Sequence, residues 1–196
     1  MPEAPIAILV LAGGRASRFP GKLEALVGGE PLVLRAFRAA SATGWPVYVS
    51  AQGPFPGEID RRLDCTVLID RQPWGGPLRA LHSACETIAH ERIFVLAADL
   101  PRIDKPLIER IAGAWLPGDE AVVPRHHEKL EPLVALYSRT AVVQESFTLF
   151  SEPRASMHDL IDRIGAHFLD VEAEYFANVN TPEDLHALDQ VPGNVR

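Results

Sequence analysis

Two adjacent glycines and three cations, Arg15, Arg18 and Lys22, follow an apolar run near the start of the chain. Residues 6–11 (IAILVL) are continuously apolar and lead into Gly13 and Gly14. Arg18 and Lys22 come a few residues later. Adjacent glycines let backbone N–H groups approach a ligand that a Cβ atom would hold away. Successive N–H groups beside cations form a concavity that suits phosphate, so this stretch predicts a nucleotide-binding loop.

The spacing of this loop excludes two familiar phosphate-binding motifs. A P-loop needs Gly, four residues and then Gly-Lys-Ser/Thr. Here six residues separate Gly14 from Gly21, and Leu23 follows Lys22. The dinucleotide fingerprint G-x-G-x-x-G does not fit residues 13–17 (GGRAS). A plain glycine-rich turn with solvated cations is the alternative on the local pattern alone.

Other polar residues follow predicted strands farther along the chain. Asp70 ends the predicted strand 65–69 and precedes the glycine-rich residues 75–77. Asp99 follows the apolar run 93–98. Strands that alternate with helices form a mostly parallel sheet covered on both faces. Ligands of such sheets bind outside the carboxyl ends of the strands, so we expect these residues and the first glycine loop on one rim.

The pattern of apolar and turn residues predicts the elements that carry this rim. Strand patterns cover residues 6–11, 46–51, 65–69, 93–98, 121–124, 133–137 and 166–171. Helical patterns follow Pro31, Pro77, Asp104, Ser138, Ser156 and Thr181, and a polar turn with His126 to Lys129 joins the two middle strands. The expected fold is α/β, a Rossmann-like, doubly wound three-layer sandwich with a mixed, mostly parallel sheet. We expect one domain over residues 1–196, with a nucleotide-binding half at about 1–101 and an acceptor-binding half at about 102–190.

Composition limits the classes of function. The chain has 196 residues, 47% of them hydrophobic and 23% charged, as in ordinary globular domains. Its net charge of −7 argues against a general nucleic-acid-binding surface. Cys65 and Cys85 form no C-x-x-C pair, which favours buried free thiols in a reducing compartment. The first apolar run is too short for a signal or a membrane span, so we expect a cytoplasmic protein with no membrane partner.

Asp99 is the strongest candidate for a metal ligand. A carboxylate that faces phosphates at a sheet rim suits Mg²⁺, which prefers oxygen ligands and keeps waters beside substrate phosphates. The alternative is a helix-capping or surface aspartate. Arg18 and Lys22 would offset the charge of a triphosphate and of a departing pyrophosphate. The adjacent His126 and His127 point to opposite faces of an extended segment, which favours hairpin residues over metal ligands.

Five motifs, in order from about residue 8 to 186, resemble those of the MobA-type nucleotidyltransferases. They are residues 11–22 (LAGG…RF…K), Asp70 with residues 76–78 (GPL), residues 99–101 (DLP), residues 131–137 (EPLVALY) and residues 176–185 (FANVNTPEDL). The last motif is the most specific, and it resembles the molybdenum cofactor guanylyltransferases. The resemblance implies a fold like that of the nucleotide-diphospho-sugar transferases.

The resemblance also implies a reaction and its residues. GMP would pass from GTP to molybdopterin or its molybdenum-loaded form, with Mg²⁺ as cofactor and pyrophosphate as product. The implied nucleotide-binding residues are Leu11, Ala12, Gly13, Gly14, Lys22, Asp70, Gly76, Pro77 and Asp99. Arg18, Lys22 and Asp99 are implied as catalytic, with Asp99 as the metal ligand. Asn178 and Asn180 are implied on the acceptor side.

Two other functions stay open. One is a related nucleotidyltransferase that uses CTP or GTP with another phosphorylated acceptor. The other is a module that holds a nucleotide or pterin without turnover, against which Lys22 and Asp99 argue. Cytidylyl relatives commonly carry Ala-Gly where this chain has Gly13 and Gly14, and this difference favours guanine. Because molybdopterin is labile, we expect transient contacts with enzymes that make it and with enzymes that receive the product.

Overall fold

The computed structural model describes residues 6–13, 19, 21–70, 75–152 and 154–189. The strands are β1 (Ile6–Ala12), β2 (Leu26–Val27), β3 (Glu30–Pro31), β4 (Val47–Ala51), β5 (Thr66–Ile69), β6 (Arg92–Ala97), β7 (Ala121–His126), β8 (Lys129–Leu130), β9 (Val134–Ser138) and β10 (Ala166–Asp170). The α-helices are α1 (Leu32–Ser41), α2 (Gly57–Asp60), α3 (Pro77–Thr87), α4 (Lys105–Gly113), α5 (Arg139–Leu149), α6 (Met157–Ile161) and α7 (Pro182–Asp189). Two 3₁₀ helices, η1 (Lys22–Glu24) and η2 (Ala173–Phe176), complete the set.

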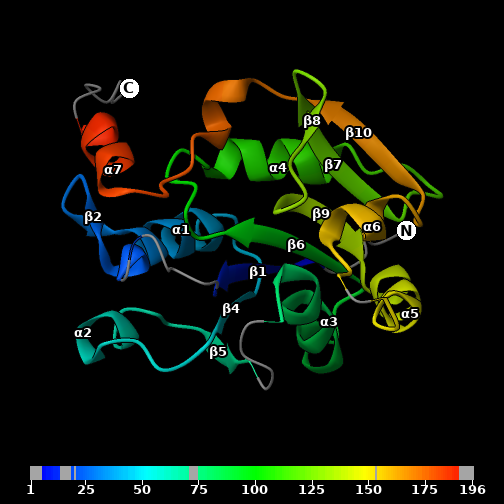
Figure 1. Ribbon diagram of the computed structural model, residues 1–196, viewed down its shortest axis with the longest axis horizontal. Coiled ribbons are helices and arrows are strands. Elements are labelled where there is room, and N and C mark those ends of the chain that lie inside the picture. The colour runs from blue at the N-terminus through cyan, green and yellow to red at the C-terminus, as the bar shows by residue number, and fades with distance from the viewer. Residues whose placement is uncertain (1–5, 14–18, 20, 71–74, 153, 190–196) are drawn as a thin grey trace.

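The central sheet has the strand order β10-β7-β9-β6-β1-β4-β5, with β8 paired to β7 (Figure 1). Strand β1 lies between β6 and β4 and is parallel to both. Strand β9 runs antiparallel to β6 and β7, whereas β10 is parallel to β7. The sheet is therefore mixed and mostly parallel, as predicted, and the carboxyl ends of β1, β4, β5 and β6 meet at one rim.

Both faces of the sheet are covered by helices, which explains the continuous apolar character of β1. Ile8 and Val10 are fully buried in the cluster to which α1 and α4 contribute. Ala7 and Leu9 are fully buried on the other face, in the cluster that contains residues of α3, α5 and α6. The three layers of the predicted sandwich are visible in Figure 1.

Local capping signals place the ends of the helices. The Asp104 carboxylate accepts a hydrogen bond from the Leu107 N–H at 3.0 Å, so it caps α4 as expected. Ser156 and Asp159 form a reciprocal capping box at the start of α6. Both pairings satisfy N–H groups that the first helical turn cannot satisfy itself.

The turn at the end of β7 is shorter than the sequence predicts. His126 belongs to β7 and Lys129 belongs to β8, and the two residues pair, so the assignment of both residues to the turn is wrong. The turn consists of His127 and Glu128, whose φ angles are 44° and 64°. Two consecutive left-handed residues form the tight turn that matches the twist of a hairpin, and pairing can therefore continue up to His126.

The C-terminal segment returns to the beginning of the chain. Val179 is fully buried against Val27 and Leu32, and Leu185 packs on the same cluster. In Figure 1, α7 accordingly lies beside β2. The connection between β2 and β3 is a tight turn at Gly28 and Gly29, both with left-handed φ angles, a conformation that glycine adopts without strain.

The two cysteines are free thiols, as the sequence predicts. Cys85 is buried and Cys65 is half-buried, and both are free. Burial raises the pKa of Cys65 to about 11 and that of Cys85 to about 12, so both thiols are weak nucleophiles.

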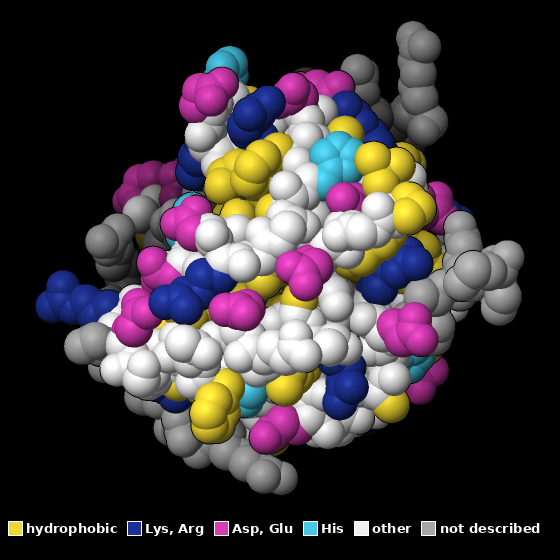
Figure 2. All heavy atoms as spheres, turned by 90° about the vertical axis from the view of Figure 1, so that its right-hand side faces the viewer, with side chains coloured by type: hydrophobic (Ala, Val, Ile, Leu, Met, Phe, Trp, Pro, Cys, Tyr) yellow, Lys and Arg dark blue, Asp and Glu magenta, His cyan; other side chains and the backbone are white. Residues whose placement is uncertain are grey.

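On the face where the parallel strands begin, acidic and basic side chains are interspersed (Figure 2). No helix among the described residues is long and apolar enough to cross a membrane.

Candidate active site

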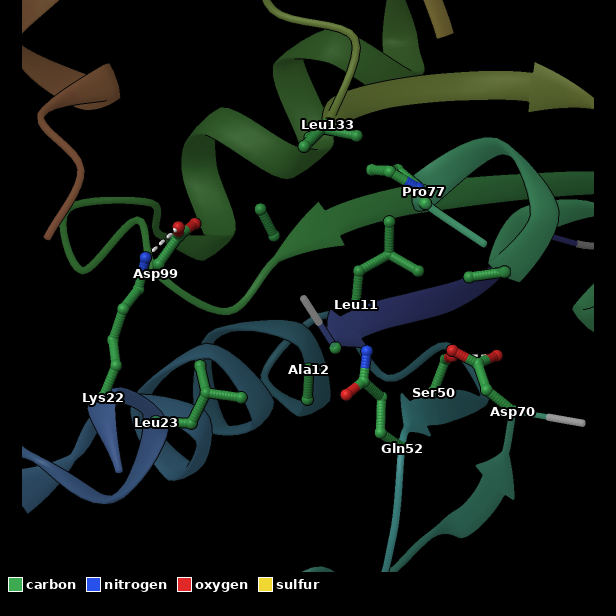
Figure 3. Close-up of a pocket in the computed structure, with 14 residues that line it drawn as sticks. Leu11, Ala12, Lys22, Leu23, Ser50, Gln52, Asp70, Pro77, Asp99 and Leu133 are labelled. Carbon is green, nitrogen blue, oxygen red and sulfur yellow. Dashed lines mark hydrogen bonds and ion pairs between the residues drawn. The ribbon is translucent and has the colours of Figure 1, made fainter. Parts of the chain in front are cut away.

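A pocket of about 450 Å³ lies at the predicted rim (Figure 3). Its lining consists of Leu11, Ala12, Gly13, Lys22, Leu23, Ser50, Gln52, Asp70, Gly76, Pro77, Ala80, Ala97, Asp99 and Leu133. Every predicted nucleotide-binding residue that the structure describes is in this set. Gly14 and Arg18 lie outside the described residues. Residues spread over more than a hundred positions of the sequence are thus brought together by the parallel strand ends.

One end of the pocket is charged. Lys22 Nζ donates to Asp99 Oδ2 at 2.6 Å and to Asn180 Oδ1 at 3.1 Å. The side chains of Lys22 and Asp99 are only 14% and 27% exposed, so water screens their attraction incompletely. Lys22 comes from η1, Asp99 follows β6, and Asn180 comes from the C-terminal segment. This end therefore joins three elements around one ammonium group.

Asn178, the other predicted acceptor residue, lies apart from these contacts. It is exposed and does not belong to the lining of the pocket as described. Between the two asparagines, the Val179 N–H donates to the Asp99 carbonyl at 3.0 Å. That bond holds the C-terminal segment against the turn that carries the Asp99 side chain. The geometry therefore ties Asn180 to the charged end, and a role of Asn178 stays a prediction.

The opposite end of the pocket carries a second carboxylate, as Figure 3 shows. Ser50 Oγ donates to Asp70 Oδ1 at 3.3 Å. Burial raises the pKa of Asp70, and the hydrogen bond from Ser50 offsets this effect in part. A Cβ atom on Gly13 would lie 3.6 Å from Asp70 Oδ2 and 3.6 Å from Gln52 Cγ. Glycine at this position therefore keeps open the space between two polar side chains.

The start of α3 and the start of β9 complete the walls. Gly76 has a φ angle of 84°, a left-handed conformation that favours glycine, and Pro77 takes the first helical position. Leu133 precedes β9, and its carbonyl accepts from the Ala97 N–H at 2.8 Å. The side chains of Leu11 and Leu133 lie on the apolar part of the pocket in Figure 3. The site thus has polar groups at two ends and an apolar wall between them, as nucleotide pockets commonly do.

Several lining residues were missed at the level of sequence. Gln52 follows β4 as Asp70 follows β5, so the rule that found Asp70 would also have found Gln52. Leu23 and Leu133 are apolar, and no sequence signal distinguishes them from core residues. They join the pocket because η1 and the start of β9 reach the rim.

Among the residues that the structure describes, Asp99 stays the predicted metal ligand of this site. Within the described residues, no group of three or more His, Cys, Asp or Glu side chains is arranged to hold a metal ion. A lone carboxylate is nevertheless compatible with Mg²⁺, which keeps several waters and takes its remaining ligands from substrate phosphates. The oxygens of Asp99 and Asn180 already surround a positive charge, that of Lys22.

Comparison with known proteins assigns the family. A family model described as "MobA-like NTP transferase domain" matches residues 8–163. The chain belongs to this family. As a MobA-like nucleotidyltransferase it is similar along most of its length to two curated proteins named "Probable molybdenum cofactor guanylyltransferase". The protein from Synechococcus elongatus is 33% identical, with 93% of this chain and 97% of that protein covered. The protein from Pelotomaculum thermopropionicum is 31% identical, with 90% of this chain and 88% of that protein covered.

Solved structures confirm the fold of this MobA-like chain. The crystal structure of molybdopterin-guanine dinucleotide biosynthesis protein A from Archaeoglobus fulgidus superimposes with a TM-score of 0.77. The alignment covers 94% of this chain and 97% of that one, at 22% sequence identity. The family resemblance inferred from the motifs and the predicted three-layer fold are both confirmed.

Proposed function

We propose that this MobA-like nucleotidyltransferase transfers GMP from GTP to molybdopterin or its molybdenum-loaded form. The observation that carries the proposal is the pocket itself, with Asp70 at one end and the Lys22–Asp99–Asn180 cluster at the other. The names of the two curated relatives support the same reaction. A nucleotide whose base lies near Asp70 would direct its phosphates toward Lys22.

Asp70 favours guanine over cytosine at the base end. An ionised carboxylate only accepts hydrogen bonds. Guanine presents two adjacent donors on its pairing edge, the N1–H and the 2-amino group, and both can reach one carboxylate. Cytosine presents a single donor group there, beside two acceptors. A half-buried carboxylate without two donors would be left partly unsatisfied, which is costly.

Lys22 and Asp99 act at the phosphate end. The ammonium group of Lys22 would neutralise phosphate charge and bind the departing pyrophosphate more strongly as charge builds on it. Asp99, with Asn180 beside it, supplies oxygen atoms that suit Mg²⁺. Bound there, Mg²⁺ supplies positive charge to the triphosphate and the leaving group. Because Lys22 now lies on Asp99, we expect the ammonium to turn toward the phosphates when nucleotide binds.

The transfer needs no protein nucleophile. A phosphate oxygen of the acceptor attacks the α-phosphorus of GTP, a P–O bond forms, and the bond to the β-phosphate breaks to release pyrophosphate. The chain contributes mainly orientation and electrostatics. Asn180 would link the site of the phosphorylated acceptor to the site of the triphosphate. Its side-chain oxygen accepts a hydrogen bond from the ammonium group of Lys22, which also binds Asp99.

Purified protein incubated with GTP, Mg²⁺ and molybdopterin tests the proposal, with mass spectrometry to detect the guanine dinucleotide. A parallel reaction with CTP tests base choice. Asp104→Asn is a suitable control for Asp99→Asn, since Asp104 caps α4 and does not line the pocket as described. Equal product from CTP would favour the related nucleotidyltransferase. No product from either nucleotide would contradict the proposal. A cytoplasmic location and transient contacts with pathway enzymes stay predictions.

A further inference from the structure

The carboxylate of Glu131 lies at the centre of a polar cluster that it forms with His126 and Lys129. Glu131 Oε1 is hydrogen-bonded to His126 Nε2 at 2.8 Å and forms an ion pair with Lys129 Nζ at 2.7 Å. The side chains of His126 and Glu131 are only 15% and 12% exposed, which strengthens their interaction relative to a surface pair. Because an ionised carboxylate only accepts, Nε2 of His126 must carry the proton that it donates.

Two hydrogen bonds hold the backbone around Glu131. The Glu131 N–H donates to the Pro124 carbonyl at 2.9 Å, and the Tyr137 hydroxyl donates to the Pro132 carbonyl at 2.8 Å. Tyr137 is fully buried, so its hydroxyl is a fixed donor. Leu133, two residues after Glu131, lines the pocket. Glu131 is therefore a rigid support that belongs to the same turn as a pocket wall.

His126 connects this support to the C-terminal segment. Its ring stacks on Phe176, with 5.0 Å between the ring centroids and an interplanar angle of 10°. Phe176 is buried. The Nδ1 atom of His126 is also buried and has no hydrogen-bond partner among the described residues, so this ring is held by Glu131 on one edge and by Phe176 on one face.

Phe176 is the first of two anchors of the segment that crosses the rim. The second is Val179, which is fully buried and donates its N–H to the Asp99 carbonyl. Asn178 lies between the anchors, and Asn180 follows the second one and contacts Lys22. With both anchors in place, the path of these few residues is determined, and with it the position of both amide side chains.

We propose that His126 and Glu131 are positioning residues for the phosphorylated acceptor. They hold Phe176, and through it they fix the segment that presents Asn178 and Asn180 to the acceptor. The inference rests on the proposed function, because it assigns a role within that reaction. Neither residue belongs to the pocket lining as described, so neither is expected to contribute to GTP binding.

Variants at His126 separate its two contacts. His126→Ala removes both, His126→Phe keeps the stack on Phe176, and His126→Gln keeps a donor for Glu131. We expect kcat/KM for the acceptor to fall about ten- to a hundredfold in His126→Ala, because small displacements of positioning groups are costly in this range. GTP affinity, measured by calorimetry, should change much less, since all the residues that line the pocket except Leu133 come from other elements. The single-contact variants should be intermediate.

Three further variants separate a positioning role from simple unfolding. Glu131→Gln keeps an acceptor oxygen and should retain near wild-type acceptor kinetics, whereas Glu131→Ala should behave like His126→Ala. His90→Ala is the matched control. His90 also has a buried Nδ1 without a partner in the described part of the chain, and it packs on the edge of Tyr48 at the other end of the sheet. All kinetic constants of His90→Ala should equal those of the wild type.

The results separate this inference from the proposed function. Absence of guanylyl transfer by the wild-type protein would overturn the proposed function and the inference with it. Wild-type transfer, together with normal acceptor kinetics in His126→Ala and Glu131→Ala, would overturn the inference alone. Equal losses for GTP and the acceptor would also overturn it, because they would indicate a general structural role. If His126→Ala does not fold, the kcat/KM values of His126→Phe and Glu131→Gln for the acceptor are compared instead. A lower value in His126→Phe would support the inference, and wild-type values in both variants would overturn it.

Discussion

Replacement of Asp70 by asparagine tests the base end of the pocket most directly. Ser50 contacts Oδ1 of this carboxylate, whereas Oδ2 faces the space beside Gly13. Asparagine has nearly the same shape, but its amide group replaces one acceptor by a donor. That donor would meet a donor of guanine. It would instead match the 2-oxo group of xanthine, so XTP is the complementary nucleotide for the variant.

The size of the effect follows from the paired hydrogen bonds. A bidentate contact between a side chain and a base discriminates by about 1–3 kcal/mol, which corresponds to about five- to 150-fold in affinity. We expect Asp70→Asn to weaken GTP binding by a factor in this range and to strengthen XTP binding comparably. Calorimetry with both nucleotides, on the wild type and the variant, measures both changes. Unchanged GTP affinity, or equal losses for GTP and XTP, would refute the assignment of Asp70 to the base.

The same variant gives a check that needs no ligand. Burial raises the pKa of Asp70, so the folded protein binds this proton more tightly than the unfolded chain. Ionised Asp70 therefore lowers the free energy of unfolding at neutral pH. Asp70→Asn should be more stable than the wild type at neutral pH. The difference should shrink as the pH falls through the raised pKa, because the wild-type side chain then becomes neutral. Urea unfolding across this range measures it, and a variant less stable than the wild type at neutral pH would contradict the argument.

Three other substitutions test separate parts of the molecule. Gly13→Ala should fold normally, because the added Cβ makes only ordinary contacts at 3.6 Å. It should weaken GTP binding, because the Cβ occupies the space between Asp70 and Gln52. Unchanged GTP affinity in calorimetry would place the base elsewhere. Asp99→Asn should lower kcat by about a hundredfold or more and shift its dependence on Mg²⁺ to higher concentrations, and an unchanged Mg²⁺ titration would exclude Asp99 as the ligand. Ser156→Ala removes one half of the capping box of α6 and should cost about 0.5–2 kcal/mol in urea unfolding, while transfer activity stays at the wild-type level. A loss of activity in this last variant would show that α6 affects the site.

Much of the fold was accessible from the sequence because its signals are local. The continuously apolar β1 and β6 indicated strands buried on both faces, and the caps at Asp104 and Ser156 indicated where helices begin. The place of His126 in β7 could not be predicted from the sequence, because the turn depends on two non-glycine residues in a left-handed conformation. No composition rule marks His127 and Glu128 for that conformation.

The sequence by itself predicted which charged side chains converge on the pocket. Lys22, Asp70 and Asp99 were identified because the carboxyl ends of parallel strands must share one rim. Only the tertiary structure decided which residue contacts which. Lys22 meets Asn180 because the burial of Val179 against Val27 and Leu32 draws the end of the chain onto its beginning. Local periodicity carries no information on pairings this distant in sequence, since they depend on the packing of side chains from separate elements.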